Sequence, residues 1–445
     1  MRFFATLVLA AVTAVPSLVF AQLSGSIGPT TSTGAKKSKK LCNVLDYGAK
    51  ADGKTDLGPA LTKAWNACAT GGLVLVPTGT YAMATWSTLN QGKGVALQLD
   101  GIINRTGTAG GTMIVIEHSN NVEFFSSTGK GAMQGNGYIF HQSGSLSGPR
   151  LVRFVNVDNF SIHDLALIDA PAFHLFMDHC NNGEVYNLIV RGGDHGGLDG
   201  IDIIGSNIHV HDVMVSNKDE CVTVKSPSSY LLIEQIYCNW SGGSAIGSLS
   251  TNTAISNIIY QNVYSVNSNQ MMMIKSSGGS GFVKDVQFNN FIGHGNAYSL
   301  DVDQDWGKQT VGSGDGVELS NISFKHWRGT CINGMQRGPV RFNCAAKAPC
   351  TGMSVSDFAV WTETGNAIEY TCANAYGSGG CLKAGSGGGY ASITTTIKAA
   401  PAGYSAPVLP DDIHTSLGFT QPISIPSWPK SFYPGTSPLK SVAGR

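Results

Sequence analysis

The chain has 445 residues, and its 29 Lys and Arg balance 29 Asp and Glu, so the formal net charge is zero. This balance argues against a nucleic-acid partner, because neutralising phosphates needs concentrated Lys and Arg. A hydrophobic share of 42% excludes a disordered protein, while a charged share of only 13% and 56 glycines favour β structure with many tight turns.

The N-terminal segment, residues 1–21, has the pattern of a signal peptide. Arg2 precedes an apolar run over residues 3–20, and we expect cleavage before Gln22. The run is short for a membrane anchor, and the sequence has no other long apolar segment. We therefore expect a secreted, extracellular protein without a membrane partner, with residues 22–40 as a flexible arm.

Cysteines and sequons agree with an oxidising compartment. Proximity along the chain suggests four disulfides, although connectivity cannot be derived from spacing: Cys42–Cys68, Cys221–Cys238, Cys344–Cys350 and Cys372–Cys381. Cys180 and Cys331 are left as buried free thiols or as a fifth bridge. Four sequons are candidate glycosylation sites: Asn104, Asn159, Asn239 and Asn321.

The first regular element is expected at residues 56–69. Leu61, Ala64, Trp65 and Cys68 follow a helical spacing, and Asp56 is a possible N-cap. Residues 73–76 then begin the strands.

A short repeat runs through the middle of the chain. Segments with the pattern apolar, any, polar, apolar recur at steps of 23 to 36 residues: Ile162–Leu165, Val185–Leu188, Val210–Val213, Ile233–Ile236, Tyr260–Val263, Phe288–Phe291, Phe324–Trp327 and Val355–Phe358.

This period predicts an all-β fold. It is too short for strand–helix–strand units, and no amphipathic helix pattern lies between the repeats. Coils of about 25 residues with short strands stack instead into a right-handed parallel β-helix. We expect this solenoid over residues 41–384, with the helix at 56–69 capping its open end and residues 385–445, rich in Gly, Ser and Pro, as an extended tail.

Acidic residues cluster beside two successive strands. Asp199 and Asp219 each lie two residues before a β-prone segment, so we expect them at equivalent places on adjacent rungs, with Asp202 and Glu220 beside them. Like charges this close raise the pKa of at least one carboxyl group, which can then donate a proton. Asp202 has a second interpretation as a residue that satisfies turn backbone, and the cluster has one as a calcium site.

Lys275 lies two coils later, near the same sheet, and is a candidate for binding an acidic sugar or else a solvated charge at a strand end. His294, on the following coil, is a further candidate sugar contact.

The motifs resemble those of glycoside hydrolase family 28, the pectin-cleaving β-helix enzymes. Residues 46–56 resemble the opening signature of that superfamily. Asp199 matches the aspartate of the family's Asn-Thr-Asp motif, and Asp219-Glu220 matches its Asp-Asp pair with Glu in second place. Lys275 matches the lysine of the Arg-Ile-Lys motif.

Two departures from the family pattern narrow the substrate. Gly242-Gly243 stands where His-Gly is expected, and Met273 replaces the arginine of Arg-Ile-Lys. In polygalacturonases the arginine and lysine grip a galacturonate together, so loss of the arginine implies that one of the two central sugars is not galacturonate. The chain is thereby similar to fungal rhamnogalacturonan hydrolases of the rhamnogalacturonase A type, which cleave galacturonate-α-1,2-rhamnose linkages in branched pectin. His294 is a candidate replacement for the missing histidine.

The resemblance implies an endo-acting, inverting hydrolase. Asp219 would be the general acid, Asp199 and Glu220 would activate the water, and Lys275 would bind a uronate, with Asp202 and His294 as further substrate-binding candidates. It implies no metal or organic cofactor, a pectic polysaccharide partner and a monomer. The alternatives are an exo-acting hydrolase, a polysaccharide lyase and a non-catalytic carbohydrate-binding β-helix.

Overall fold

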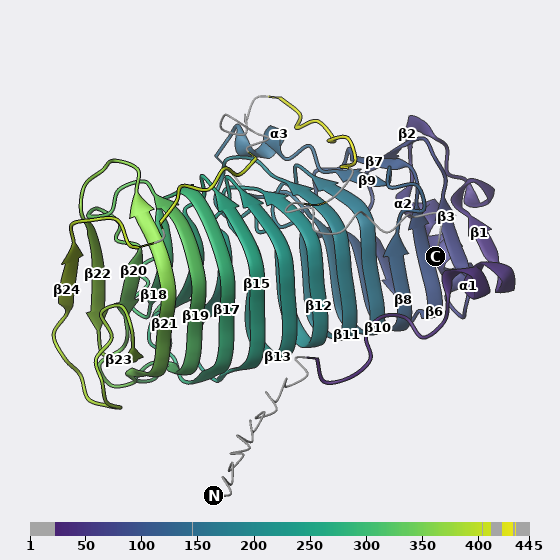
Figure 1. Ribbon diagram of the computed structural model, residues 1–445. Helices are drawn as coiled ribbons and strands as arrows, with labels where there is room; N and C mark the ends of the chain where they lie inside the picture. Colours follow the sequence, from purple (N-terminus) through teal and green to yellow (C-terminus); the bar gives the residue numbers. More distant parts are fainter. Residues whose placement is uncertain (1–22, 145, 403, 411–420, 430–431, 433–445) are drawn as a thin grey trace, which may run out of the picture.

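The computed structural model describes residues 23–144, 146–402, 404–410, 421–429 and 432. They form a β-solenoid of about 12 turns, in which flat strands stack side by side along one axis (Figure 1). The predicted parallel β-helix is confirmed. The expected signal peptide, residues 1–21, lies outside the described residues. Among the described residues, no helix combines the length and apolar character that crossing a membrane requires.

The elements follow one another in chain order with few helices. The helical elements are α1 (Thr33–Lys39), η1 (Val44–Tyr47), α2 (Gly58–Cys68) and α3 (Tyr138–His141). The strands of the first half are β1 (Leu41–Asn43), β2 (Asp52–Asp56), β3 (Leu73–Val76), β4 (Thr80–Met83), β5 (Ser87–Asn90), β6 (Lys93–Leu99), β7 (Ile102–Arg105), β8 (Thr112–Phe125), β9 (Ala132–Gln134), β10 (Arg150–Ile168), β11 (Leu175–Arg191) and β12 (Ile201–Ser216). Those of the second half are β13 (Glu220–Asn239), β14 (Gly243–Leu249), β15 (Thr253–Val266), β16 (Gln270–Ser276), β17 (Gly281–Asn296), β18 (Tyr298–Asp303), β19 (Glu318–Cys331), β20 (Val340–Asn343), β21 (Cys350–Thr362), β22 (Ile368–Ala373), β23 (Ala375–Ser378) and β24 (Ile393–Ile397).

The four-residue repeat marks a corner of every coil. Its apolar positions stack in register, as where Val185 pairs with Ile162 on one side and Val210 on the other, and these side chains are buried in the core. The polar third residue of each repeat has a positive φ: Asp164, Asn187, Asp212, Gln235, Asn262, Asn290, His326 and Asp357. Asn and Asp tolerate this left-handed conformation better than most side chains, so the polar position of the pattern produces a bend.

A second bend precedes the first by five residues in each of these coils. It is formed by Asn159, Asn182, Asn207, Tyr230, Asn257, Asp285, Asn321 and Gly352. The two bends delimit a short straight segment on each rung, and these segments stack into one narrow sheet whose alternate side chains face outward.

The capping helix is present, but its start differs from the prediction. The residue before α2 is Leu57, and Asp56 instead accepts hydrogen bonds from the N–H groups of Gly58, at 3.2 Å, and Ala84, at 2.9 Å. Asp56 therefore ties the helix start to the next coil rather than capping the helix alone. Leu61 and Trp65 are fully buried against the first coils, as a cap requires.

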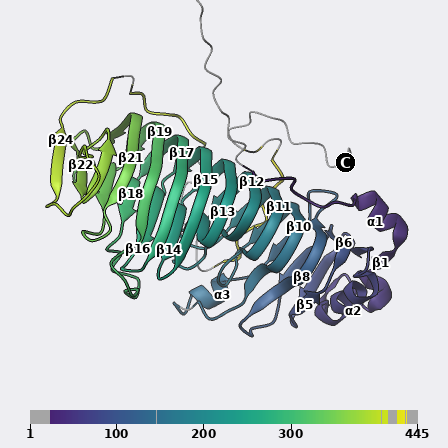
Figure 2. The ribbon, with the colours of Figure 1, turned by 90° about the horizontal axis from the view of Figure 1, so that it is seen from below.

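The segment expected to be a flexible arm is instead docked. Residues 33–39 form α1, and the buried Lys36 makes an ion pair of 3.6 Å with Glu123. Upstream, Asn207 at a coil bend donates its side-chain N–H to Ser26 O at 3.0 Å and accepts from Gly25 N–H at 3.2 Å. The bend asparagines thus supply hydrogen bonds that hold this segment along the coils (Figure 2).

The described residues of the C-terminal segment contact both late and early coils (Figure 1). Strand β24 pairs antiparallel with β22 on a late coil. Leu409 packs beside Tyr237 and Tyr264 in the middle of the stack, and Trp428 and Phe432 pack on the early strands β9–β11.

The cysteines and sequons give mixed results. All four suggested disulfides are present. Cys180 and Cys331 are buried free thiols rather than a fifth bridge, and burial raises the pKa of both to about 12. Asn239 is fully buried in β13, so its sequon is excluded as a glycan site in the folded chain, whereas Asn321 is exposed.

The bends generate a prediction about stability. Asn187 is buried, has φ 51°, and donates its side-chain N–H to Asp164 at 2.8 Å. Asn187→Ala should lower the free energy of unfolding by about 1–3 kcal/mol, because it leaves a buried acceptor unpaired and strains the bend. Gln235→Asn, at the equivalent bend with φ 54°, should not destabilise the protein. Thermal melts of both variants test this, and unchanged melting of Asn187→Ala would contradict it.

Candidate active site

The acid cluster forms, but with a register one residue away from the prediction. Ile201 pairs with Val222, and Gly200 N–H donates to Glu220 O at 2.8 Å, so Asp199 is level with Glu220 rather than with Asp219. The turn before β13 contains a left-handed residue, Lys218.

Carboxylate oxygens of three acids nevertheless converge. Asp199, Asp219 and Glu220 each offer one oxygen within 4.8 Å of the others. Asp199 and Glu220 are each only 5% exposed, and Asp219 is partly exposed. The expected meeting of these acids on adjacent rungs is thus present in the structure.

Asn217 joins the two turns that carry the acids. Its fully buried side chain donates to the backbone oxygens of Leu198, at 2.7 Å, and Glu220, at 2.8 Å. Asp219 in turn accepts hydrogen bonds from the N–H groups of Gly197 and Glu220. Backbone donors of this kind fix the orientation of a carboxylate.

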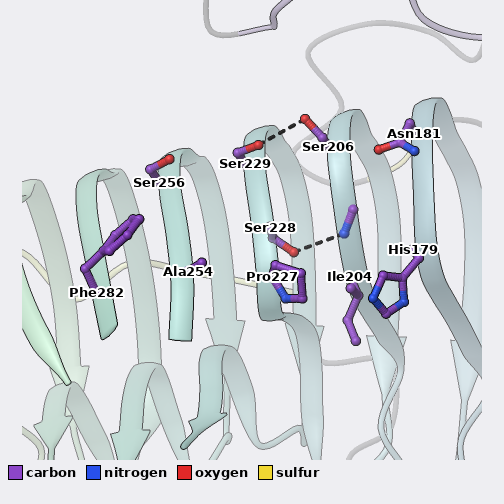
Figure 3. Close-up of a pocket in the computed structure, with 11 residues that line it drawn as sticks. His179, Asn181, Ile204, Ser206, Pro227, Ser228, Ser229, Ala254, Ser256 and Phe282 are labelled. Atoms are coloured by element: carbon purple, nitrogen blue, oxygen red, sulfur yellow. Dashed lines mark hydrogen bonds between the residues drawn. The ribbon is translucent and has the colours of Figure 1, made fainter. Parts of the chain in front are cut away.

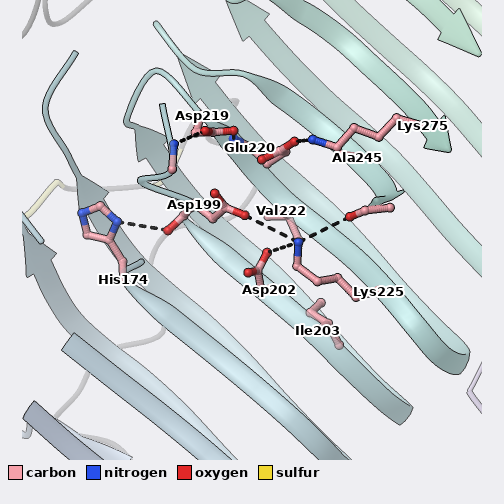
Figure 4. Close-up of polar contacts among 12 residues, drawn as sticks. His174, Asp199, Asp202, Ile203, Asp219, Glu220, Val222, Lys225, Ala245 and Lys275 are labelled. Carbon is pink, nitrogen blue, oxygen red and sulfur yellow. Dashed lines mark hydrogen bonds and ion pairs between the residues drawn. The ribbon is translucent and has the colours of Figure 1, made fainter. Parts of the chain in front are cut away.

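A buried histidine contacts the backbone oxygen of Asp199. His174 is fully buried, its backbone N–H donates to Asp199 O at 3.0 Å, and its Nδ1 lies 3.1 Å from the same oxygen (Figure 4). Burial lowers the pKa of His174 to about 4, so its ring is neutral. On the other side, the Cys221–Cys238 disulfide anchors the strand that begins with Glu220.

Lys225 is a site residue that sequence reasoning missed. Its ammonium lies 3.6 Å from Asp199 and 3.4 Å from Asp202 (Figure 4). Burial alone would lower the pKa of Lys225, but the two carboxylates outweigh it and raise that pKa. The segment Val222-Thr-Val-Lys225 carries one charge at the end of an apolar strand, which is the only sequence signal for it.

The pKa values of two acids are raised. Burial is the largest cause for Asp199, followed by the charge of Asp219, and Lys225 opposes the shift. For the completely buried Asp202, burial again comes first, followed by Asp199, and its pKa is raised well above the usual range. Asp202 lies inside β12 and faces a lysine, so its interpretation as a residue that satisfies turn backbone is wrong.

Lys275 reaches the cluster from two coils away. Its ammonium forms an ion pair with Glu220 (Figure 4). The same ammonium lies 5.8 Å from the ring centroid of Trp306. Two ammonium groups, from Lys225 and Lys275, therefore face the acids. They occupy the electrostatic role that a calcium ion would have, which weakens the calcium interpretation of the cluster.

The backbone around position 242 leaves no room for the side chain of a histidine. A Cβ on Gly242 would lie 2.5 Å from the backbone carbon of Asp219, and one on Gly243, which has φ +90°, would lie 2.0 Å from Gln270 O. The chain approaches so closely here that position 242 accepts a side chain only if Asp219 moves, and position 243 only if Gln270 moves.

His294 is not brought to the acids. It pairs in the sheet with Val266, which pairs with Asn239, two rungs from the end of β13. Its ring instead makes an ion pair of 3.5 Å with Glu363. The structure therefore gives no support to His294 as a replacement for the missing histidine. Met273 is 1% exposed, stacked between Ala245 and Asp301 in the sheet.

A separate pocket lies on another part of the coils. It has a volume of about 380 Å³ and is lined by His179, Asn181, Ile204, Gly205, Ser206, Pro227, Ser228, Ser229, Ala254, Ser256 and Phe282 (Figure 3). None of these residues is a carboxylic acid, so the pocket offers no acid and base pair, and the chemistry belongs with the cluster around Asp219.

Comparison with known proteins agrees with this geometry. The model of the family Glycosyl hydrolases family 28 matches residues 70–381, more than half of the chain. The chain is 57% identical over 446 residues to "Probable rhamnogalacturonase B" of Neosartorya fischeri, covering 100% of this chain and 86% of that protein. It is 55% identical over 438 residues to "Rhamnogalacturonase A" of Aspergillus aculeatus, covering 98% and 99%.

Solved structures show the same architecture. The endo-xylogalacturonan hydrolase from Aspergillus tubingensis superposes with a TM-score of 0.66 at 25% identity, covering 78% of this chain and 100% of that one. A polygalacturonase from Erwinia carotovora superposes with a TM-score of 0.55 at 15% identity, covering 76% and 97%, and shares the fold.

Lys225 generates a prediction with a definite pH dependence. An acid whose pKa is raised by folding makes the protein less stable as pH rises from its ordinary value to the raised one. Lys225→Met removes the charge that opposes these shifts, so the pKa of Asp199 and Asp202 should rise further. The variant should lose about 3 kcal/mol at pH 7, where a buried pair is broken, and less at pH 4, where protonation of acids with a raised pKa removes part of the unpaired charge.

Thermal melts at the two pH values measure the difference. Lys218→Met is the matched control, because Lys218 pairs with the more exposed Asp194 at 3.2 Å. An equal loss of stability at pH 4 and pH 7 in Lys225→Met would show that the lysine does not neutralise the acids.

Proposed function

Because the chain belongs to glycosyl hydrolases family 28, and is therefore a glycoside hydrolase, we propose that it cleaves galacturonate-α-1,2-rhamnose linkages within the rhamnogalacturonan I backbone of pectin. The observation that carries the substrate is the pair of positions 273 and 275. Lys275 provides one cation beside Glu220, while Met273 is a buried thioether side chain where polygalacturonases have an arginine. Lys225 is engaged by the buried Asp199 and Asp202, so Lys275 without an arginine at 273 suits a site in which only one of the two central sugars is a uronate.

Lys275 is the uronate-binding group in this proposal. Its ion pair with Glu220 holds the ammonium at the acids before substrate arrives, and a uronate carboxylate competes for the same charge. Trp306, beside that ammonium, offers an aromatic face to the neighbouring sugar.

Asp219 is proposed as the general acid that protonates the leaving oxygen, from its position in the family's Asp-Asp motif. Asp199 and Glu220 would hold and deprotonate the water. The raised pKa of Asp199 suits a base that must later carry a proton. Asn217 and His174 act as positioning residues, because they contact the backbone of these acids rather than the space between them.

Inversion is proposed from the family, and the separation of the carboxylates here is shorter than in most inverting enzymes. Inverting enzymes usually separate their two carboxyl groups by about 6.5–9.5 Å, whereas the nearest oxygens here lie within 4.8 Å. The anomeric configuration of the first product therefore belongs in any test of the mechanism.

The same proposal extends to location and assembly. Four disulfides and the sequence features of residues 1–21 support secretion, and the coils close around their own core, which supports a monomer.

Substrate specificity is tested with two polymers. Deacetylated rhamnogalacturonan should yield new reducing ends and oligomers without ultraviolet absorbance, and homogalacturonan should stay intact, because position 273 has a methionine where polygalacturonases have an arginine. Proton NMR of the first product should show the β-anomer of galacturonate. Cleavage of homogalacturonan, monomer release alone, unsaturated products or the α-anomer would each overturn the corresponding part of the proposal.

The role of Asp219 is tested by Asp219→Asn. We expect kcat on rhamnogalacturonan to fall by about 10²–10⁴-fold with an unchanged melting temperature, because a proton donor is lost without loss of shape. Asp194→Asn, on a neighbouring turn, should keep normal kcat. Near-normal kcat of Asp219→Asn would remove Asp219 from the mechanism.

A further inference from the structure

A second group of titratable side chains lies outside the acid cluster, on the narrow sheet between the two bends. Glu184 on β11 pairs in register with His209 on β12, and His211 on β12 pairs with Glu234 on β13. Val185, Val210 and Ile233, which alternate with them, are buried in the core. The four polar side chains therefore stand on the outer face of three consecutive rungs.

Their donor atoms converge. His211 Nε2 lies 3.2 Å from Glu184 Oε1, and His209 Nε2 lies 2.9 Å from Glu234 Oε1. One ligand atom each from Glu184, His209 and His211 lies within 4.8 Å of the others. Around a tetrahedral Zn²⁺ with bonds of about 2.0–2.1 Å, ligand atoms lie about 3.3 Å apart, so small movements bring this group to that geometry.

The side chains behind these atoms already have the orientation of a metal site. Asp212 Oδ2 lies 2.7 Å from His211 Nδ1, which fixes the ring and leaves Nε2 directed at Glu184. Gln261 donates its side-chain N–H to Glu234 Oε2 at 2.6 Å, which leaves Oε1 directed at His209. A carboxylate behind a histidine is the usual outer partner of a zinc ligand.

A related group earlier in the same sheet shows the contrast. His163 lies between Asp164, at 2.7 Å, and Glu123, at 3.2 Å, as His211 lies between Asp212 and Glu184. There the charge of Glu123 is balanced by the ammonium of Lys36 at 3.6 Å. In the second group His209 stands beside His211, with the two ring centroids 4.2 Å apart.

We propose that Glu184, His209, His211 and Glu234 form a binding site for a divalent transition metal of the Zn²⁺ class. The atoms of Glu184, His209 and His211 already converge, and a movement of the Glu234 carboxylate, now 2.9 Å from His209, would add the fourth ligand. Four protein ligands make a closed shell, as in structural rather than catalytic zinc sites. The metal would join three successive coils across their outer face. The site takes no part in the hydrolysis proposed above and does not depend on it.

The experiment titrates Zn²⁺ alone into the untagged, full-length chain after treatment with a chelator, by calorimetry at neutral pH and low protein concentration. We expect one Zn²⁺ per chain and a higher melting temperature when it is bound. His211→Gln and His209→Gln should each weaken binding at least 10-fold, and Asp212→Asn should weaken it by about 10–100-fold. His326→Gln is the matched control, because His326 also contacts an aspartate, Asp357, but has no second histidine beside it.

Two outcomes would overturn the proposal. The first is the absence of Zn²⁺ binding, or equal binding in His211→Gln and His326→Gln. The second is loss of binding in Asp219→Asn, which would assign the metal to the acid cluster instead. Asp212→Asn keeps the test decisive if the histidine variants fail to fold, because Asp212 lies behind the ligands at an exposed bend.

Discussion

The pairing of Ile201 with Val222 is the contact on which the active site depends. Both side chains are buried in the core, so the register of β12 on β13 is fixed by the hydrophobic effect over a long strand pair. Everything polar at the start of these strands follows from that register. Asp199 becomes level with Glu220, and the turn between them presents Asp219 to the same space. A solenoid thus lets apolar packing determine where charged groups meet.

Bringing these acids together costs stability, and the neighbouring lysines offset it. Without Lys225, the burial that raises the pKa of Asp199 and Asp202 would make their ionised forms destabilising at neutral pH. Lys275 makes the same compensation for Glu220 from the next coils. In a protein with so few charges, this concentration of both signs marks the site more clearly than the shape of any pocket does.

The sequence allowed the fold to be predicted because a coil repeats its own pattern. Apolar residues at both ends of each four-residue repeat could be recognised as core, and nearby cysteines could be paired because a coil brings near residues together. The polar third position was visible as a pattern, but its role as a left-handed corner, as at Asn187, required backbone angles. Asp199, Asp219 and Glu220 could be found as a group for the same reason that the coils could.

Sequence reasoning missed features of the site that depend on turns, strand pairing and backbone contacts. Asp199 is level with Glu220 rather than with Asp219, after a turn that contains the left-handed Lys218. The depth of Asp202 and the reach of Lys225 follow from strand pairing that no local pattern encodes. Asn217 acts through two backbone oxygens, which a sequence does not display. His294 had the right residue type, but the coil spacing put it on a different part of the stack.

The C-terminal segment adds contacts between coils that are far apart in the solenoid. A stack of coils is quasi-one-dimensional, so it can fray from either end and tolerates the loss or gain of a coil. Here a segment that starts beside β22 is fastened again on β9–β11, where Gln134 donates to Ile423 O at 2.7 Å and Trp428 packs beside Phe432. The described parts of this segment therefore contact coils far apart along the axis, so the C-terminal end of the chain covers side chains of the early coils as well as pairing with a late one.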